Sequence, residues 1–265
     1  MKTFTCIILI ILTAGCGQKE KKQINDNMVI AHRGAWKTQN LPENSIASLK
    51  EAIALGCYGS EFDVHLTKDD IMVVNHDKDF MGMDIETSTY EELLVKELSN
   101  GEKIPTLKAY LQAGLKQNKT KLILEIKTAP SGTERTLKLT KMAVDLVHSL
   151  QGQSLVEYIC FNYEAGQLVR KMDPKTPIAY LNGDVSPKEA KEVGYTSLDY
   201  NMKVYRNHPE WIKEAQTEGM TINVWTVNTK EDMEEMIQNG VDFITTNEPE
   251  QLIQLLKKKT NEPKE

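Results

Sequence analysis

Residues 59–77 read GSEFDVHLTKDDIMVVNHD, in which two runs rich in β-branched and apolar residues flank a polar turn. A two-residue loop at positions 69 and 70 would join these runs into a β-hairpin. In that register Asp63 lies opposite His76, and Glu61 shares their face because side chains alternate along a strand. Two carboxylates and an imidazole on one face suit a divalent cation beside a proton-transfer group. The alternative is that these residues form the solvated face of the hairpin.

The composition of the chain is that of a single globular domain with a large core. It has 265 residues, of which 40% are hydrophobic, and this length is in the range of an α/β barrel. The formal charge is -6, and the only block of basic residues is at positions 257–259. We therefore expect no nucleic-acid partner, and no sequence feature indicates an obligate protein partner.

The first residues indicate export. One Lys is followed by an apolar run at positions 7–12, which is too short for a mature transmembrane helix, so residues 1–15 are predicted to be a signal peptide. The sequence LTAGC that ends at Cys16 resembles a bacterial lipobox, with Thr13 in the place of the usual Leu. We therefore predict lipidation of Cys16 and a polar tether over residues 16–27. An exported lipoprotein, membrane-anchored on the periplasmic or cell-surface side, is expected.

Two cysteines remain after the predicted signal and lipidation residues are set aside. Cys57 and Cys160 are far apart in the sequence, one at the end of a predicted helix and one inside a predicted strand. They could pair in an oxidising compartment, but we expect buried free thiols.

Strand-like and helix-like segments alternate from residue 28 onward, a pattern typical of a parallel sheet with crossover helices. The predicted strands are residues 28–32, 59–66, 121–127, 156–162, 177–181, 196–200, 221–227 and 241–245. The predicted helices are residues 44–55, 106–117, 133–150, 163–172, 187–193, 209–218, 230–239 and 249–258. Eight such pairs predict one α/β domain, a (β/α)8 TIM barrel over residues 28–258, with a small β-hairpin extension after the second strand and a polar tail at 259–265.

Polar residues gather where the predicted strands end, which is the edge that carries the chemistry of such barrels. His32 and Arg33 follow the first strand, Glu125 and Lys127 end the third, and Trp225 lies on the seventh. Each has an ordinary structural explanation when taken singly: a core histidine, a buried ion pair, or a core-filling indole. Their occurrence together at one rim favours a functional site.

Eight short motifs occur in order along the same region. They are AHRG at 31–34, LPENS at 41–45, EFDVHLTKD at 61–69, VVNHD at 73–77, IPTL at 104–107, LEIK at 124–127, VWTVN at 224–228 and DFITTNEP at 242–249. Together they resemble the glycerophosphodiester phosphodiesterase family, over residues 28 to about 256. The resemblance implies a barrel enzyme that hydrolyses a glycerophosphodiester to glycerol 3-phosphate and an alcohol.

Carried over by this resemblance, Glu61, Asp63 and Glu125 would bind a divalent metal ion, Mg²⁺ or Ca²⁺. Oxygen ligands suit these hard cations and argue against zinc. His32 and His76 would be the catalytic acid and base, since imidazole exchanges protons near neutral pH.

The resemblance also implies four residues that contact the substrate. Arg33 and Lys127 would hold the phosphate, and Glu43 would orient Arg33 or touch the metal. Trp225 would line the place where the alcohol group sits. The alternatives for function are a lysophospholipase D or phospholipase C-like activity on membrane lipids, and a non-catalytic lipoprotein that binds glycerophosphodiesters.

Two departures from the family pattern lie next to the hairpin. Asp70 stands where the family usually has Gly, which predicts a variant turn because Asp tolerates left-handed conformations less well. Residues 78–84, KDFMGMD, replace an Asp-Arg-Thr-Thr type of sequence. Their apolar residues would favour a bulkier alcohol or would only pack on the barrel.

Overall fold

The structure is a computed structural model and is described for residues 24–261. The predicted signal peptide, Cys16 and most of the predicted tether lie outside the described residues. In the described part of the chain, no helix is long and apolar enough to cross a membrane.

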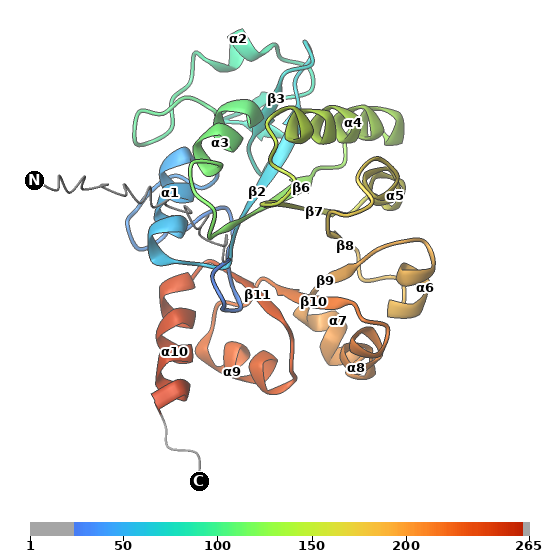
Figure 1. Ribbon diagram of the computed structural model, residues 1–265. Helices are drawn as coiled ribbons and strands as arrows, with labels where there is room; N and C mark the ends of the chain where they lie inside the picture. The colour runs from blue at the N-terminus through green and yellow to red at the C-terminus, as the bar shows by residue number, and fades with distance from the viewer. Residues whose placement is uncertain (1–23, 262–265) are drawn as a thin grey trace, which may run out of the picture.

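Eight parallel strands close into a barrel, as the sequence predicted (Figure 1). The strands are β1 (Val29–Ala31), β2 (Gly59–Leu66), β6 (Lys121–Ile126), β7 (Val156–Cys160), β8 (Ile178–Tyr180), β9 (Ser197–Asn201), β10 (Thr221–Trp225) and β11 (Phe243–Thr246). Neighbours pair in the order β1-β11-β10-β9-β8-β7-β6-β2, and pairing of β1 with β2 closes the ring. All eight predicted strands are confirmed, with ends within two residues of the prediction.

A ring of helices surrounds the strands (Figure 1). They are α1 (Ile46–Leu55), α3 (Leu107–Gly114), α4 (Thr133–Ser149), α5 (Tyr163–Met172), α6 (Pro187–Glu192), α8 (Glu210–Thr217), α9 (Lys230–Gln238) and α10 (Pro249–Asn261). Side-chain caps begin several of them: Ser45 accepts a hydrogen bond from the amide of Ser48, and Thr229 does so from that of Asp232. The eight predicted helices are confirmed, with ends within three residues.

The core has two layers because side chains alternate across each strand. Outward-facing residues such as Leu122 and Leu124 pack against the helices. Inward-facing Ile30, Ile123 and Ile159 fill the inside of the barrel. Cys57 and Cys160 are buried free thiols in the outer layer, as predicted.

The predicted register of the hairpin after β2 is wrong by one residue. Strand β3 (Met72–Val74) runs antiparallel to β2, but Val64 pairs with Val74, so Asn75 lies opposite Asp63 in place of His76. The loop has three residues, because the amide of Thr67 bonds to Ile71 O and Asp70 adopts a left-handed φ of 62°. Asp70, in its left-handed conformation, adds one residue to the loop, and this shifts every cross-strand pair between β2 and β3 by one position.

The segment between β3 and α3 forms a small separate cluster. Two elements that the sequence did not predict lie there: the hairpin β4 (Asp79–Phe80) with β5 (Met83–Asp84), and the helix α2 (Tyr90–Leu93). Buried Val73, Phe80 and Ile85 pack together in this cluster. The third unpredicted element is helix α7 (Met202–Asn207), which follows β9. These elements are short and depend on tertiary packing more than on a periodic pattern.

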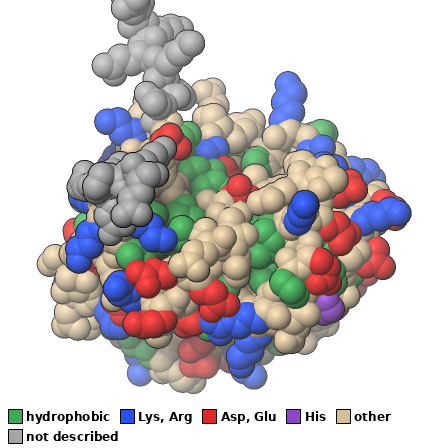
Figure 2. Space-filling model, turned by 90° about the horizontal axis from the view of Figure 1, so that it is seen from below, with side chains coloured by type: hydrophobic (Ala, Val, Ile, Leu, Met, Phe, Trp, Pro, Cys, Tyr) green, Lys and Arg blue, Asp and Glu red, His purple; other side chains and the backbone are tan. Residues whose placement is uncertain are grey.

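The surface carries charges of both signs. On the face in Figure 2, Lys and Arg side chains are interspersed with Asp and Glu. Among the described residues on this face, no extended basic patch is visible.

Gly34 is a position where an added methyl group should be costly. Its φ is +81°, and a Cβ there would lie 2.7 Å from Ser48 Cβ, whereas Gly101 has nearly the same φ of +82° with nothing within 4 Å. Gly101→Ala should therefore cost about 1 kcal/mol from backbone strain alone. Gly34→Ala should cost about 1–3 kcal/mol more in free energy of unfolding, measured by urea denaturation. If both variants lost the same free energy of unfolding, the contact between Gly34 and α1 would not be as close as the structure indicates.

Candidate active site

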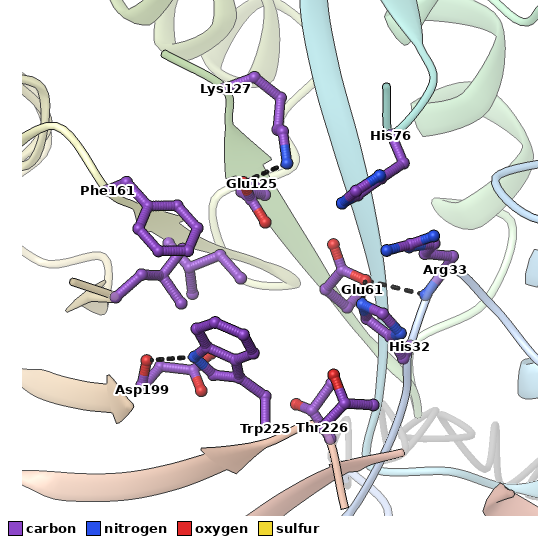
Figure 3. A pocket seen from close by; sticks show the side chains of 13 residues that line it. His32, Arg33, Glu61, His76, Glu125, Lys127, Phe161, Asp199, Trp225 and Thr226 are labelled. Atoms are coloured by element: carbon purple, nitrogen blue, oxygen red, sulfur yellow. Dashed lines mark hydrogen bonds and ion pairs between the residues drawn. The ribbon is translucent and has the colours of Figure 1, made fainter. Parts of the chain in front are cut away.

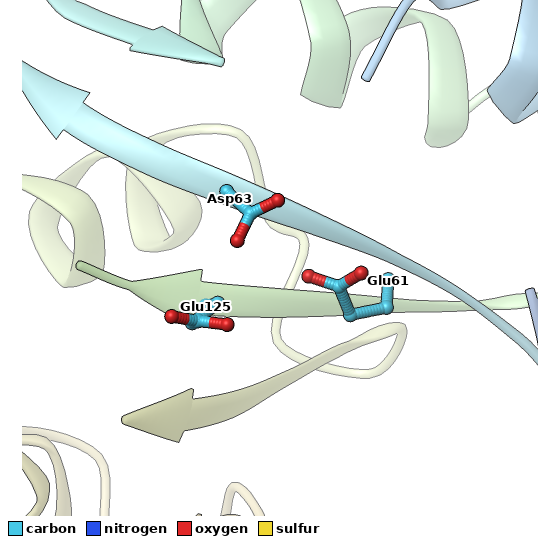
Figure 4. A group of neighbouring side chains, drawn as sticks. All are labelled: Glu61, Asp63 and Glu125. Carbon is cyan, nitrogen blue, oxygen red and sulfur yellow. The ribbon is translucent and has the colours of Figure 1, made fainter. Parts of the chain in front are cut away.

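Three carboxylates from two neighbouring strands meet inside the barrel at its C-terminal end (Figure 4). Glu61 and Asp63 are two residues apart on β2 and so share the inward face, and Glu125 on β6 is the cross-strand partner of Asp63. One carboxylate oxygen of each lies within 4.8 Å of those of the others, and all three side chains are buried. Such closeness of like charges is unfavourable without a compensating cation.

The repulsion changes the proton affinity of the cluster. Burial, together with the charges of Asp63 and Glu125, raises the pKa of Glu61 well above its usual value. Burial and the charge of Asp63 likewise raise the pKa of Glu125 to about 8. Burial also acts on Asp63, but Lys127 and a hydrogen bond from Asn44 outweigh it and lower its pKa. Asp63 therefore stays ionised while its neighbours hold protons more tightly.

Two basic side chains lie against the cluster. Lys127 Nζ is 2.8 Å from Glu125 Oε1 and 3.2 Å from Asp63 Oδ1. Arg33 donates its backbone N–H to Glu61 Oε2 at 2.8 Å, and its guanidinium Nη1 pairs with Glu43 Oε2 at 2.6 Å. Glu43 thus contacts Arg33 and is not one of the clustered carboxylates.

The cluster fits a hard divalent cation. It offers only carboxylate oxygens, which Mg²⁺ and Ca²⁺ prefer. Glu61 Oε1 is buried and accepts no hydrogen bond from any described residue. A divalent ion would displace the protons of Glu61 and Glu125. The three ionised carboxylates, Lys127, and the Arg33–Glu43 pair would then carry a charge of -2, which the ion would neutralise.

The two predicted catalytic histidines come from different elements and face the same cavity (Figure 3). His32 follows β1, and its Nδ1 lies 2.7 Å from Asn247 Oδ1; burial and Arg33 lower its pKa to about 4. His76 follows β3, and its Nδ1 donates to Asp77 Oδ1 at 2.7 Å, since a carboxylate can only accept. Each ring thus has Nε2 left for proton exchange with a ligand.

Residues to which the sequence assigned no role hold the predicted ones in place. Asn44 donates to Asp63 Oδ2 at 2.8 Å and accepts the Asp63 backbone N–H. His65 Nε2 donates to the backbone carbonyl of His76 at 3.1 Å. Asn44 and His65 lie within motifs that the sequence analysis quoted, but nothing in the sequence shows which side chain each one contacts.

A cavity of about 230 Å³ connects these groups (Figure 3). One side is polar and is lined by His32, Arg33, Glu61, His76, Glu125 and Lys127. The other side is mainly apolar and is lined by Ile159, Phe161, Leu181 and Trp225. The indole of Trp225 is fixed by a hydrogen bond from Nε1 to Asp199 O at 2.8 Å and by an edge contact with Phe161.

Asp199 is a buried carboxyl at the apolar side that the sequence analysis missed. It is the cross-strand partner of Asn223, whose Nδ2 donates to Thr245 Oγ1. Oδ1 of Asp199 and Oδ1 of Asn223 are both buried without a hydrogen bond from a described residue. Burial raises the pKa of Asp199 to about 7, and a hydrogen bond with the Asn223 side chain opposes part of this shift.

The free energy of unfolding of the Asp199→Asn variant, relative to that of the wild type, should increase as the pH rises. Between its ordinary pKa of 3.8 and about 7, Asp199 is protonated in the folded protein and ionised in the unfolded chain. Unfolding therefore releases a proton, and the wild type loses about 1.4 kcal/mol of stability per pH unit in this window. Urea denaturation should show the advantage of the variant growing by about 2–3 kcal/mol from pH 5 to 7 and then levelling off. A constant difference would contradict the buried, protonated carboxyl.

Comparisons with known proteins give the family. A model of the glycerophosphoryl diester phosphodiesterase family matches residues 32–251. The glycerophosphodiester phosphodiesterase of Caldanaerobacter subterraneus is 34% identical, covering 87% of this chain and 98% of that protein. A solved enzyme of the same name from Parabacteroides distasonis is 46% identical with a TM-score of 0.86, covering 90% of this chain and all of that one.

A more distant structure shares the fold. The phosphodiesterase of Oleispira antarctica, solved in complex with the product sn-glycerol-3-phosphate, has a TM-score of 0.73 at 22% identity, covering 87% of this chain and 97% of that one. The family match over residues 32–251 extends over nearly the whole barrel and includes all the clustered carboxylates. The chain therefore belongs to the glycerophosphoryl diester phosphodiesterase family of hydrolytic enzymes.

Proposed function

We propose that the protein hydrolyses glycerophosphodiesters to glycerol 3-phosphate and an alcohol, with a divalent cation and two histidines. The observation that carries the proposal is that buried carboxylates, two basic side chains and two imidazoles line one cavity. The substrate class comes from the relatives at 34% and 46% identity, which are named for this activity.

Each group has a chemical task on a phosphodiester, which is an anion with a poor leaving group. Arg33 and Lys127 offset the charge on the non-bridging oxygens, and Glu43 fixes the direction of the guanidinium. Glu61, Asp63 and Glu125 would hold the cation. When bound, Mg²⁺ or Ca²⁺ supplies further stabilisation of the negative charge that develops on the phosphate.

The histidines move the protons. One imidazole takes the proton of the attacking hydroxyl, which in this proposal is the neighbouring hydroxyl of the glycerol itself. The other gives a proton to the alkoxide oxygen as its bond to phosphorus breaks. Water then opens the cyclic phosphate with the two proton transfers reversed. Asn247 and Asp77 keep Nε2 of each ring available for these transfers.

The sequence-derived membrane anchor belongs to the same proposal. A lipid at Cys16 would tether the barrel to a membrane surface, where it would act on diesters released from lipids. That anchorage stays a prediction from the sequence.

Removing the metal or one of its ligands should abolish most of the activity. We expect EDTA to lower the release of glycerol 3-phosphate from glycerophosphodiesters at least 100-fold, and Mg²⁺ or Ca²⁺ to restore it. The Glu61→Gln variant should show an equal loss of activity, and added Mg²⁺ or Ca²⁺ should not restore it. Glu157→Gln is the control, because Glu157 is a carboxylate on β7 that binds Tyr58 and Lys121 away from the cluster. Full activity in EDTA would contradict the metal site.

Removing either histidine should affect turnover and leave binding intact. His32→Ala and His76→Ala should each lower kcat by about 10²–10⁴-fold, while the affinity for glycerol 3-phosphate, measured by calorimetry, stays within several fold. His148→Ala serves as control, since His148 pairs with Asp173 and does not line the cavity. If kcat survives in either cavity variant, the acid-base assignment is wrong.

A further inference from the structure

A second cleft, of about 350 Å³, adjoins the catalytic cavity. Arg33 and His76 line both, so their side chains form the boundary between the two spaces. The outer wall is the segment around β4, including Phe80 and Met81. The cleft therefore begins at the side chains proposed to hold the phosphate and to exchange a proton with it.

A phosphodiester needs two spaces, because its two ester arms leave the phosphorus in different directions. The glycerophosphate part is common to all substrates of this class, and the small cavity inside the barrel mouth matches an invariant group. The second cleft is bounded by exposed side chains, with Asp77 72% and Met81 49% exposed. An open cleft of this kind suits the part of the substrate that varies, which is the departing alcohol.

The cleft has a distinct chemistry. Three carboxylates line it, and because Glu43 is paired with Arg33, the charges of Asp77 and Asp79 remain. Its apolar lining comes from Pro42, Phe80, Met81 and Leu98. Carboxylates beside apolar surface recognise an alkylammonium group, whose charge and methyl or methylene groups are satisfied together. An anionic alcohol would be repelled by the same carboxylates.

We propose that this cleft is the subsite of the departing alcohol, and that it selects alcohols that carry an ammonium group, such as choline or ethanolamine. This inference rests on the proposed function and specifies its substrate. It assigns a role to residues 78–84, which differ from the usual family sequence. In this proposal Trp225, which the family resemblance placed beside the alcohol, would instead line the space of the glycerol, because it borders the catalytic cavity and not the second cleft.

Two substrates distinguish this subsite from the catalytic groups: glycerophosphocholine, whose alcohol is cationic, and glycerophosphoglycerol, whose alcohol is neutral. The wild type should have a kcat/KM several-fold higher for glycerophosphocholine. Asp79→Asn removes one negative charge and keeps an acceptor for the amide of Gly82, which Asp79 Oδ1 binds at 2.9 Å. This variant should lose about three- to tenfold in kcat/KM for glycerophosphocholine and less than twofold for glycerophosphoglycerol.

A charge placed at the cleft wall gives a second measurement. Met81→Lys puts a cation beside the alcohol and should lower kcat/KM for glycerophosphocholine about tenfold relative to Met81→Gln, with little change for glycerophosphoglycerol. Val95→Lys is the matched control, because Val95 is 72% exposed on the same segment and does not line the cleft. Thermal melts should show all three variants folded, and Val95→Lys should keep the wild-type preference.

The outcomes separate the two claims. A substrate preference that shifts with Asp79→Asn and Met81→Lys, and not with Val95→Lys, supports the subsite. Equal changes for both substrates, or no change, would overturn the subsite while leaving the phosphodiesterase activity intact. No turnover of either diester by the metal-loaded wild type would overturn the proposed function itself, and the subsite with it.

Discussion

The repulsion between Glu61, Asp63 and Glu125 is the constraint around which the site is built. Three carboxylates within 4.8 Å of one another, all removed from water, would be severely unfavourable if they were only part of a core. Lys127, the backbone N–H of Arg33 and the amide of Asn44 each offset part of this cost. In the proposed function, a divalent cation would add the remaining positive charge.

The barrel makes such a cluster possible because its strands are held rigidly on both sides. β2 pairs with β6 over six residues, and this fixes Asp63 directly beside Glu125. The histidines enter from the ends of β1 and β3, and each is oriented by one hydrogen bond at Nδ1. The two imidazoles proposed to exchange protons are therefore held by other residues than the clustered carboxylates, and both line the same cavity as Glu61 and Glu125.

The wall of the same cavity opposite the carboxylates is mainly apolar. Phe161, Leu181 and Trp225 come from the opposite half of the barrel. Asp199 lies among them as a buried carboxyl whose pKa is raised to about 7 by burial. Beyond Arg33 and His76, the short segment around β4 adds a cleft of a different character, open and acidic. In the proposed substrate complex, the barrel would bind the glycerophosphate and this segment would select the alcohol.

The sequence by itself determined the barrel, because periodic patterns, helix caps and strand ends are local and depend on residues close in the chain. It also indicated Glu61, Asp63, Glu125 and His32 as a group, since the ends of parallel strands meet at one rim. His76 joined this group through the family resemblance, because the hairpin register that placed it opposite Asp63 was wrong.

Only the tertiary structure decided the register of the β2–β3 hairpin, because this register depends on the left-handed conformation of the single residue Asp70. Contacts between distant residues were likewise beyond the sequence: Asn247 at His32, Asn44 at Asp63, and Asp199 at Asn223. Hydrogen bonds of this kind depend on how separate strands are aligned in space, and this alignment cannot be predicted from a local sequence pattern.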